Sequence, residues 1–365
     1  MEHFYIFAQS KCDDYVSLRQ NFHNMAQSLP IDLFLHRARH APVIDVRSPA
    51  EFAQGHIPCA LNLPLFDNHE RAEVGTLYVQ KGRTLAVQRG LEMVGPKLKR
   101  FTDFVLGLKS AELCVYCWRG GMRSAAMAWL FETVGIRCIT LEHGYKAYRN
   151  HVLESFAKPL QIVLLGGFTG GGKTEILHAL HAAGEQTLDL EALANHKGSA
   201  FGGIGQAPQP STEHFENLIH EKIATLDRLK PLWIEDESRN VGKCALPAPF
   251  WAQMRLAPLV CIDTSRQVRI PRLMEEYACF DTALLCEAIK KIEKRLGFDR
   301  CKEAYNACLK GDRQTALEIC LDYYDKAYAN QLLERFGPEW EDRLPTFAPH
   351  FPFDDEQIKK LITHA

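Results

Sequence analysis

The sequence has no surplus of one charge, no long apolar run and no dense set of cysteines. Lysine and arginine total 43 against 45 aspartate and glutamate residues. This balance excludes a protein coated in basic surface, so a nucleic-acid partner would need a local basic patch. The strongest apolar run, IVLLGGF, is far too short to cross a bilayer, which excludes a membrane-spanning protein. The opening MEHFYIFAQSKCDDY lacks a basic stretch followed by an apolar one, so we expect no signal peptide.

The 12 cysteines are scattered over 365 residues and form no paired CxxC motifs of the kind that bind zinc. This usage is far below that of small secreted proteins held by disulfides, so we expect reduced thiols and a cytoplasmic protein. A chain of this length is also long for one hydrophobic core, and two domains are the first expectation.

Short apolar strands alternate with helical stretches twice along the chain, which is typical of parallel βαβ units. The predicted strands lie at 43–46, 112–117, 136–144, 161–166, 231–237 and 257–264. From about Ser265 the pattern becomes helical, and the stretch PTFAPHFPFDD is predicted to be an extended tail. The resulting division is an N-terminal extension, 1–30, a first α/β domain, 31–155, a second α/β domain, 156–265, and a helical C-terminal region, 266–365.

The glycine-rich stretch GFTGGGKT matches the phosphate-loop pattern GxxxxGK[ST] in full. It follows the strand QIVLLG and opens the helix TEILHALHAAG, which is the context that the pattern requires. Backbone N–H groups of such a loop point at phosphate oxygens, and the helix N-terminus adds partial positive charge. An ordinary glycine-rich turn is the weaker alternative. The candidate phosphate-binding residues are Gly167, Gly170, Gly171, Gly172, Lys173 and Thr174.

The acidic stretch LWIEDES, at the end of the next predicted strand, is expected to complete this phosphate site. Glu235 or Asp236 would hold Mg²⁺ together with Thr174, directly or through water. A solvated acidic turn is the alternative interpretation.

The segment VYCWRGGMRSAAMAWLF places Cys117 where a strand ends, shortly before a helix begins. Backbone N–H groups of this loop can converge on the sulfur or its cargo, and the helix dipole with Arg119 and Arg123 favours a thiolate. Gly120 and Gly121 permit positive φ and the close approach of a ligand. A buried structural cysteine beside surface arginines is the alternative.

Cys114 and Cys117 form a CxxC motif, which raises the alternative of a dithiol redox pair. Such pairs lie at the start of a helix, whereas Cys114 lies within the predicted strand. We therefore expect Cys114 to belong to the core.

The stretches VIDVRSPAEFAQGHIPCALNLP and YCWRGGMRS together resemble the rhodanese domain, a persulfide-forming sulfurtransferase module. Arg47, Glu51, Gly55 and His56 match its DVR…EF…GHIP signature. Cys59 stands where rhodaneses usually have glycine, and we expect it to have a packing role. The loop has the spacing C-x5-R in place of the usual C-x4-R. It is similar to the loop of rhodanese-like phosphatases, which indicates a phosphate-bearing donor.

A rhodanese-like parallel-sheet domain followed by a P-loop NTPase-like α/β domain with a helical C-terminal extension resembles the bacterial tRNA 2-selenouridine synthase family. The resemblance covers residues 43 to about 330. It is carried by the stretches NLPLFDNHERAEVGTLYVQKG, HGYKAYR, DLEALANHKGSAFGGIGQAPQPSTEHFEN, EDESRNVGK and LEICLDYYDKAY.

The resemblance implies a two-step reaction at the wobble 2-thiouridine of certain tRNAs. Geranyl diphosphate first alkylates the sulfur, with the phosphate loop and Mg²⁺ stabilising the leaving diphosphate. Selenophosphate then supplies selenium, which Cys117 would carry as a nucleophile to C2 of the uridine. Arg119 and Arg123 would bind the donor's phosphate oxygens. The apolar residues of the C-terminal helices are interpreted as ordinary core rather than as a pocket for the geranyl chain.

The same resemblance places further polar residues near the phosphate loop, in contact with diphosphate, metal or tRNA, although a solvated turn is the alternative. These candidates are His196, Lys197, Ser199 and Arg239. Arg269 and Arg272 share one face of the helix after CIDT, where a phosphate-sensing lid and a solvated face are equally favoured.

Three other functions remain open at this point: an ATP-dependent rhodanese-type sulfurtransferase, a cysteine phosphatase and a non-catalytic tRNA-binding module. For tRNA, the stretches HRARH, KLKR and GYKAYRNH interleave basic and aromatic residues, although each alone is more often a solvated face. We expect no membrane partner, and the sequence leaves the oligomeric state open.

Overall fold

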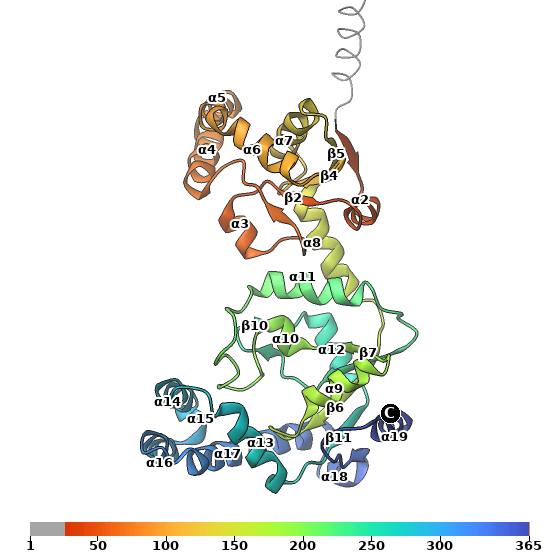
Figure 1. The fold of residues 1–365 in the computed structure, drawn as a ribbon, viewed down its shortest axis with the longest axis vertical. Coiled ribbons are helices and arrows are strands. Elements are labelled where there is room, and N and C mark those ends of the chain that lie inside the picture. The colour runs from red at the N-terminus through yellow and green to blue at the C-terminus, as the bar shows by residue number, and fades with distance from the viewer. Residues whose placement is uncertain (1–25, 365) are drawn as a thin grey trace, which may run out of the picture. The chain divides into compact units, whose positions relative to one another are not determined.

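The computed structural model describes residues 26–364, which fold into two compact units that divide between Val152 and Leu153 (Figure 1). Most of the expected N-terminal extension, 1–25, lies outside the described residues. Within the described residues, no helix combines the length and the apolar character that a membrane crossing requires.

The first unit is built on a five-stranded, wholly parallel sheet with the strand order β1-β5-β4-β2-β3. The strands are β1 (Gln27–Leu29), β2 (Val43–Asp45), β3 (Leu61–Asn62), β4 (Glu112–Tyr116) and β5 (Arg137–Leu141). The three strands predicted in this part of the chain are thereby confirmed. β1 lies within the segment that the sequence assigned to the N-terminal extension. Its short sequence, QSL, has no apolar pattern that would predict a strand, and it becomes one by pairing with the edge of β5.

Helices cover this sheet, and their apolar side chains supply most of the core. Phe101 and Phe131 are fully buried and pack in one cluster with Ile44 and Val115 of the central strands. The helices are α2 (Ile31–Ala38), α3 (Pro49–Gln54), α4 (Asn68–Lys81), α5 (Arg83–Val94), α6 (Leu98–Gly107), α7 (Met122–Thr133) and α8 (Gly144–Ser155), with a 3₁₀ turn η1 at Gly95–Lys97.

The second unit also contains a parallel five-stranded sheet, with the order β12-β11-β6-β8-β7. The strands are β6 (Gln161–Gly167), β7 (Gln186–Leu188), β8 (Pro231–Glu235), β11 (Leu259–Ile262) and β12 (Thr346–Phe347), and β9 (Asn240–Val241) pairs with β10 (Cys244–Ala245) in a small hairpin. The strand β12 comes from the stretch predicted to be a tail. It pairs with β11 at the edge of the sheet, and its Phe347 is buried in the apolar cluster of that sheet.

The C-terminal region is helical, as its sequence predicts, and forms a second core in this unit. The helices of the unit are α9 (Lys173–Ala182), α10 (Leu190–Ala194), α11 (Thr212–Ile223), α12 (Ala248–Leu256), α13 (Arg266–Tyr277), α14 (Thr282–Lys291), α15 (Glu293–Leu296), α16 (Phe298–Leu309), α17 (Arg313–Phe336), α18 (Trp340–Arg343) and α19 (Asp355–His364). The longest, α17, runs alongside α13 and α16 (Figure 1). The α/β fold class with parallel sheets is therefore confirmed.

A buried ion pair lies inside the first unit, at the end of β2. The guanidinium of Arg47 donates hydrogen bonds to both oxygens of Asp45, the shortest at 2.6 Å, and to the carbonyl of Gly55 at 2.6 Å. It also lies 3.8 Å from the ring centroid of Tyr145. Both partners of the pair are almost fully buried. Arg47, the arginine of the rhodanese-like signature, therefore has a structural role.

Replacing Arg47 with alanine should destabilise the first unit by about 3 kcal/mol, because it leaves the buried charge of Asp45 without a partner. Native-state hydrogen exchange should show faster exchange of the amides of β2 and β4. Arg39→Ala is the control, since Arg39 is exposed. Unchanged protection of both strands in Arg47→Ala would contradict this interpretation.

Candidate functional site

The cysteine loop connects β4 to α7 and is held in place by the start of α8. The carbonyls of Cys117 and Trp118 accept hydrogen bonds from the amides of Tyr145, at 2.8 Å, and Lys146, at 3.0 Å. Gly144 has φ +59, and a Cβ there would lie 2.3 Å from the carbonyl oxygen of Cys117. The loop can approach α8 this closely only because position 144 has no side chain.

The tyrosines of the stretch GYKAYRNH pack inside the first unit, whereas its Lys146 is exposed. Tyr145 and Tyr148 are fully buried, so their rings are unavailable for stacking on RNA bases. In the stretch KLKR, Lys97 pairs with Glu70, and Lys99 pairs with Asp103 at 2.7 Å. These ion pairs neutralise part of that basic patch.

Cys117 is 3% exposed at the end of its strand, and its Sγ lies 3.2 Å from Oγ of Ser124 in the first turn of α7. The Ser124 hydroxyl donates to the carbonyl of Gly121 at 3.1 Å, and rotated toward the sulfur it can donate a hydrogen bond to a thiolate. The α7 N-terminus also favours negative charge in the loop. Gly120 has φ +63, and a Cβ there would lie 2.5 Å from the carbonyl of Leu141, so this turn requires glycine.

The two loop arginines occupy different environments. Arg123 forms a two-contact ion pair with Glu51, at 2.8 and 3.3 Å, whereas Arg119 is exposed. Burial raises the pKa of Glu51, but the hydrogen bond and charge of Arg123 outweigh it and lower that pKa overall. The guanidinium of Arg123 is therefore already engaged, and Arg119 is the more accessible cation for an incoming anion.

The surroundings of two other cysteines of the first unit, Cys114 and Cys59, bear on the roles expected for them. Cys114 is fully buried, and burial raises the pKa of its thiol to about 12. Neither Cys114 nor Cys117 is in a disulfide. These surroundings favour a core residue over a redox pair. Cys59 has φ +64, in the region that favours glycine, and its side chain is exposed, so the predicted packing role is wrong.

The phosphate loop occupies the turn between β6 and α9. Nζ of Lys173 donates a hydrogen bond to the carbonyl of Gly167 at 2.9 Å. Gly170 and Gly172 have φ +78 and +83, and a Cβ at Gly172 would lie 2.4 Å from the ring of Phe351. The predicted phosphate-binding residues come together along one groove of about 880 Å³. The residues that the sequence predicted to bind phosphate therefore all line this groove.

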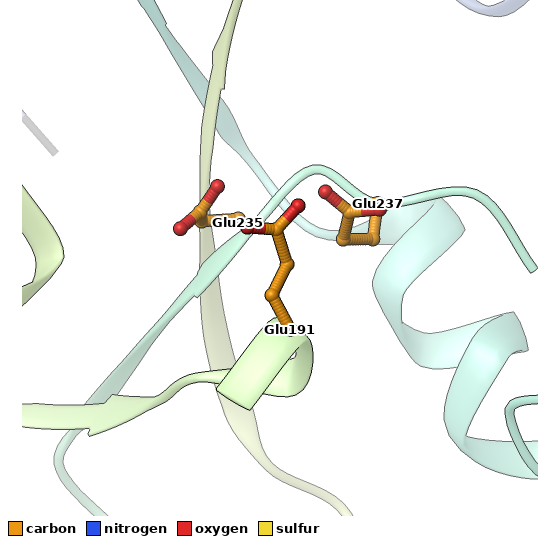
Figure 2. A group of neighbouring side chains, drawn as sticks. All are labelled: Glu191, Glu235 and Glu237. Carbon is orange, nitrogen blue, oxygen red and sulfur yellow. The ribbon is translucent and has the colours of Figure 1, made fainter. Parts of the chain in front are cut away.

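Three glutamates form the opposite part of the groove: Glu191 at the start of α10, Glu235 at the end of β8, and Glu237 just beyond it (Figure 2). One oxygen of each lies within 4.8 Å of the others. Burial and the neighbouring carboxylates raise the pKa of Glu191 to about 10 and that of Glu237 to about 7. The sequence indicated Glu235 but missed Glu191 and Glu237, although both lie in the quoted family stretches.

Glu235 is the carboxylate best placed for a cation. It is 3% exposed, burial raises its pKa, and its Oε1 has no hydrogen-bond partner among residues 26–364. Its side chain also has a hydrogen bond to Thr174 of the phosphate loop. Carboxylate and hydroxyl oxygens are the ligands that Mg²⁺ prefers, so these residues fit a divalent cation.

Asp236, the other predicted metal ligand, is engaged elsewhere. Its Oδ1 accepts a hydrogen bond from Arg335 at 3.1 Å and its Oδ2 accepts one from Tyr328 at 3.1 Å. The hydroxyl of Tyr328 also accepts a hydrogen bond from the amide of Gly167 at 2.9 Å. Asp236 therefore links α17 to the phosphate loop. Both of its oxygens already accept hydrogen bonds from α17 side chains.

The remaining predicted residues divide between the groove and the surrounding structure. Lys197 and Ser199 line the groove, and Lys197 pairs with Glu276. His196 does not line it and lies instead against Gly242 of the small hairpin. Arg239 is exposed outside the groove.

The two arginines of α13 differ in their surroundings: Arg269 is buried and does not form a solvated face, whereas Arg272 lies at the phosphate groove. Arg269 is buried, with two contacts of 2.8 Å to Asp325 of α17 and a hydrogen bond to the carbonyl of Thr169 at 3.1 Å. Arg272 lines the groove, pairs with Glu175 at 2.6 Å and lies 4.0 Å from the ring centroid of Phe351. Both therefore fix α13 beside the phosphate loop.

Comparison with known proteins agrees with both halves of this structure. The rhodanese-like domain matches residues 32–151, and the tRNA 2-selenouridine synthase AAA domain matches residues 160–338. The tRNA 2-selenouridine synthase of Sulfurovum sp. is 36% identical over 332 residues, covering 80% of this chain and 89% of that protein. The protein of the same name from Pseudomonas fluorescens is 34% identical, covering 80% of this chain and 88% of its own.

A third relative, the tRNA 2-selenouridine synthase of Bdellovibrio bacteriovorus, is 40% identical over 66% of this chain and 65% of that protein. The first two alignments include both the cysteine-loop unit and most of the phosphate-loop unit. Identity of this level over most of both chains confirms the resemblance that the sequence motifs carry. The chain therefore belongs to the tRNA 2-selenouridine synthase family of tRNA-modifying transferases.

Proposed function

We propose that this protein converts 2-thiouridine at the wobble position of tRNA to 2-selenouridine, through an S-geranylated intermediate, using geranyl diphosphate and then selenophosphate. The observation that carries the proposal is that one chain of this family has two strand–loop–helix sites suited to phosphate groups. One contains the thiol of Cys117, and the other contains Lys173 opposite the three glutamates.

In the alkylation step, the sulfur of 2-thiouridine bonds to C1 of the geranyl group while the bond from C1 to the diphosphate oxygen breaks. The N3 proton of the uridine passes to water, so the S-geranylated base is neutral. Negative charge grows on the departing diphosphate, where the amides of 170–174 and the ammonium of Lys173 would stabilise it. This chemistry requires no activated water, so a nucleotide-hydrolysis base is unnecessary at the site.

Glu235 and Thr174 would hold Mg²⁺ in this proposal, with Glu191 and Glu237 beside them. When bound, the ion would neutralise charge on the diphosphate. Asp236 is not included because Arg335 and Tyr328 occupy its oxygens.

Glu235→Gln and Asp236→Asn should separate the metal ligand from the structural carboxylate. Glu235→Gln should lower geranylation about a hundredfold and raise the Mg²⁺ concentration needed for half-maximal rate. Asp236→Asn should keep the wild-type Mg²⁺ requirement and lose about 2 kcal/mol of stability, since it weakens the contact with Arg335. Rates measured over a Mg²⁺ titration test both variants, and an altered Mg²⁺ requirement in Asp236→Asn alone would reverse the assignment.

The selenium step can be written in a form that keeps phosphorus pentavalent. Thiolate attack on the selenium of selenophosphate, the selenium-carrying role first expected for Cys117, would release phosphite and so reduce phosphorus. We infer instead that the selenium of selenophosphate bonds to C2 of the uridine and expels geranylthiolate. Cys117 Sγ then bonds to the phosphorus, the phosphorus–selenium bond breaks, and 2-selenouridine leaves. Water hydrolyses the resulting phosphocysteine to phosphate.

The geometry of the cysteine loop supports this role. Ser124 can donate a hydrogen bond to the sulfur, which stabilises the thiolate both as nucleophile and as leaving group. The exposed Arg119 is available to the phosphate oxygens. The loop spacing C-x5-R is also the one associated with phosphate-handling cysteines.

Nucleoside mass spectrometry of 2-thiouridine tRNA incubated with the purified protein tests the proposal. Geranyl diphosphate alone should give the S-geranyl nucleoside, and selenouridine should appear only when selenophosphate is added as well. Consumption of ATP with formation of neither product would instead support the ATP-dependent sulfurtransferase.

A further inference from the structure

An apolar cavity of about 50 Å³ lies beside the phosphate loop, among α13, α14, α16 and α17. Leu273, Leu285, Ile289 and Ala316 are among its lining residues, together with Thr169 of the phosphate loop itself. A cavity with such walls offers water few hydrogen-bond partners, so it favours an apolar occupant.

Two polar side chains at this cavity, those of Arg313 and Tyr324, already have hydrogen-bond partners. The guanidinium of Arg313 donates hydrogen bonds to the carbonyls of Tyr277, at 3.3 Å, Ala278, at 2.8 Å, and Phe280, at 3.0 Å. The hydroxyl of Tyr324 accepts one from the amide of Ala200 at 3.0 Å. A purine base placed here would therefore leave its ring nitrogens without partners, which is costly, whereas a hydrocarbon would not.

The cavity adjoins the phosphate groove, and the two share part of their walls. The residues that line both are Thr169, Ser199, Leu273, Tyr277 and Tyr324. Leu273 marks the junction, since a Cβ added at Gly170 would lie only 2.7 Å from its side chain. A ligand with its anionic head on the phosphate loop would therefore have its next atoms directed at Leu273 and the apolar walls.

We propose that this cavity binds the distal part of the isoprenoid chain of the allylic diphosphate and that its walls limit the chain length accepted. The inference rests on the proposed function and adds the residues that select the substrate. Leu285, Ile289 and Cys308 line the cavity but not the groove, so they form the end remote from the phosphates. The C-terminal helices are thus more than the ordinary core that their sequence suggests.

Calorimetric titration of the full chain with Mg²⁺ and four ligands tests this assignment: inorganic, dimethylallyl, geranyl and farnesyl diphosphate. Wild type should bind geranyl diphosphate about a hundredfold more tightly than inorganic diphosphate, since the distal part of the chain leaves water. Ala316→Leu, which fills the cavity, should weaken geranyl diphosphate about tenfold and leave inorganic diphosphate unchanged.

Leu285→Ala and Leu296→Ala form a matched pair. Both leucines belong to the same core, with exposures of 6% and 8%, but only Leu285 lines the cavity. Both variants should lose similar stability, whereas only Leu285→Ala should shift preference toward farnesyl over geranyl diphosphate, by about tenfold. Equal preferences in the two variants, or geranyl diphosphate bound no more tightly than inorganic diphosphate, would overturn the cavity assignment.

These outcomes are distinguishable from failure of the proposed function. If wild type still forms S-geranyl nucleoside while the cavity variants behave like the control, the function stands and the cavity assignment is wrong. If the chain-length preferences follow the cavity as expected but no geranylated nucleoside forms, the cavity assignment stands and the alkylation proposal is wrong.

Discussion

Lys173→Ala should lower the rate of geranylation about a thousandfold, while conversion of a synthetic S-geranyl tRNA to selenouridine continues. The ammonium of Lys173 now bonds the carbonyl of Gly167 at the mouth of the loop, where a diphosphate would replace that contact. Its removal leaves the loop amides in place but takes away the full positive charge that the phosphate loop itself offers to the leaving group. The loss should therefore appear in the rate rather than in folding.

Single-turnover measurements with separate substrates test this result. One assay follows geranyl transfer to 2-thiouridine tRNA, and the other follows selenation of tRNA that is already geranylated. Lys310→Ala is the control, because Lys310 is an exposed lysine at the end of α16, outside the groove. Equal losses in both assays would indicate that the phosphate loop serves the selenium step as well.

Cys117→Ala should abolish selenouridine formation, a loss of about ten-thousandfold, and leave geranylation intact. The thiol is held at the bottom of the loop by the contacts that fix the backbone to α8, and alanine preserves that backbone. Among the described residues of the first unit, Cys117 is the only cysteine in this loop. The variant therefore removes the nucleophile without removing the phosphate-binding amides.

The product that accumulates in Cys117→Ala distinguishes the two roles considered for the sulfur. If the thiolate accepts a phosphoryl group, a selenium-phosphorylated nucleoside should accumulate. If the thiolate carries selenium, the S-geranyl nucleoside should remain instead. Cys114→Ala is the matched control, and it should retain activity because Cys114 is a core residue with a raised pKa. Selenouridine formed at the wild-type rate by Cys117→Ala would contradict both roles.

Both loops could be located from the sequence because each is a local motif. In each case an apolar strand, a glycine-rich turn and a helix follow one another within a short stretch, so the chain itself positions the amides. The pattern from Gly167 to Thr174 and the run from Cys117 to Arg123 needed no distant partner to be recognised. The parallel α/β class followed from the same alternation of strands and helices.

The partners of those loops depended on contacts between distant segments, which no local pattern contains. The sheet order brings Glu191 beside Glu235, and the position of α17 engages the carboxylate of Asp236 through Arg335. Glu51 similarly engages Arg123 across the first unit.

The apolar residues of α13, α14, α16 and α17 have the same helical spacing whether they fill a core or line a cavity. In the structure they do both, since Leu285, Ile289 and Ala316 belong to the helical core and also line the cavity. The sequence by itself therefore determined the family, the fold class and the positions of the two glycine-containing loops. Only the tertiary structure decided which carboxylates and arginines are already paired, and where the apolar helices leave a cavity, because burial and pairing are properties of the folded chain.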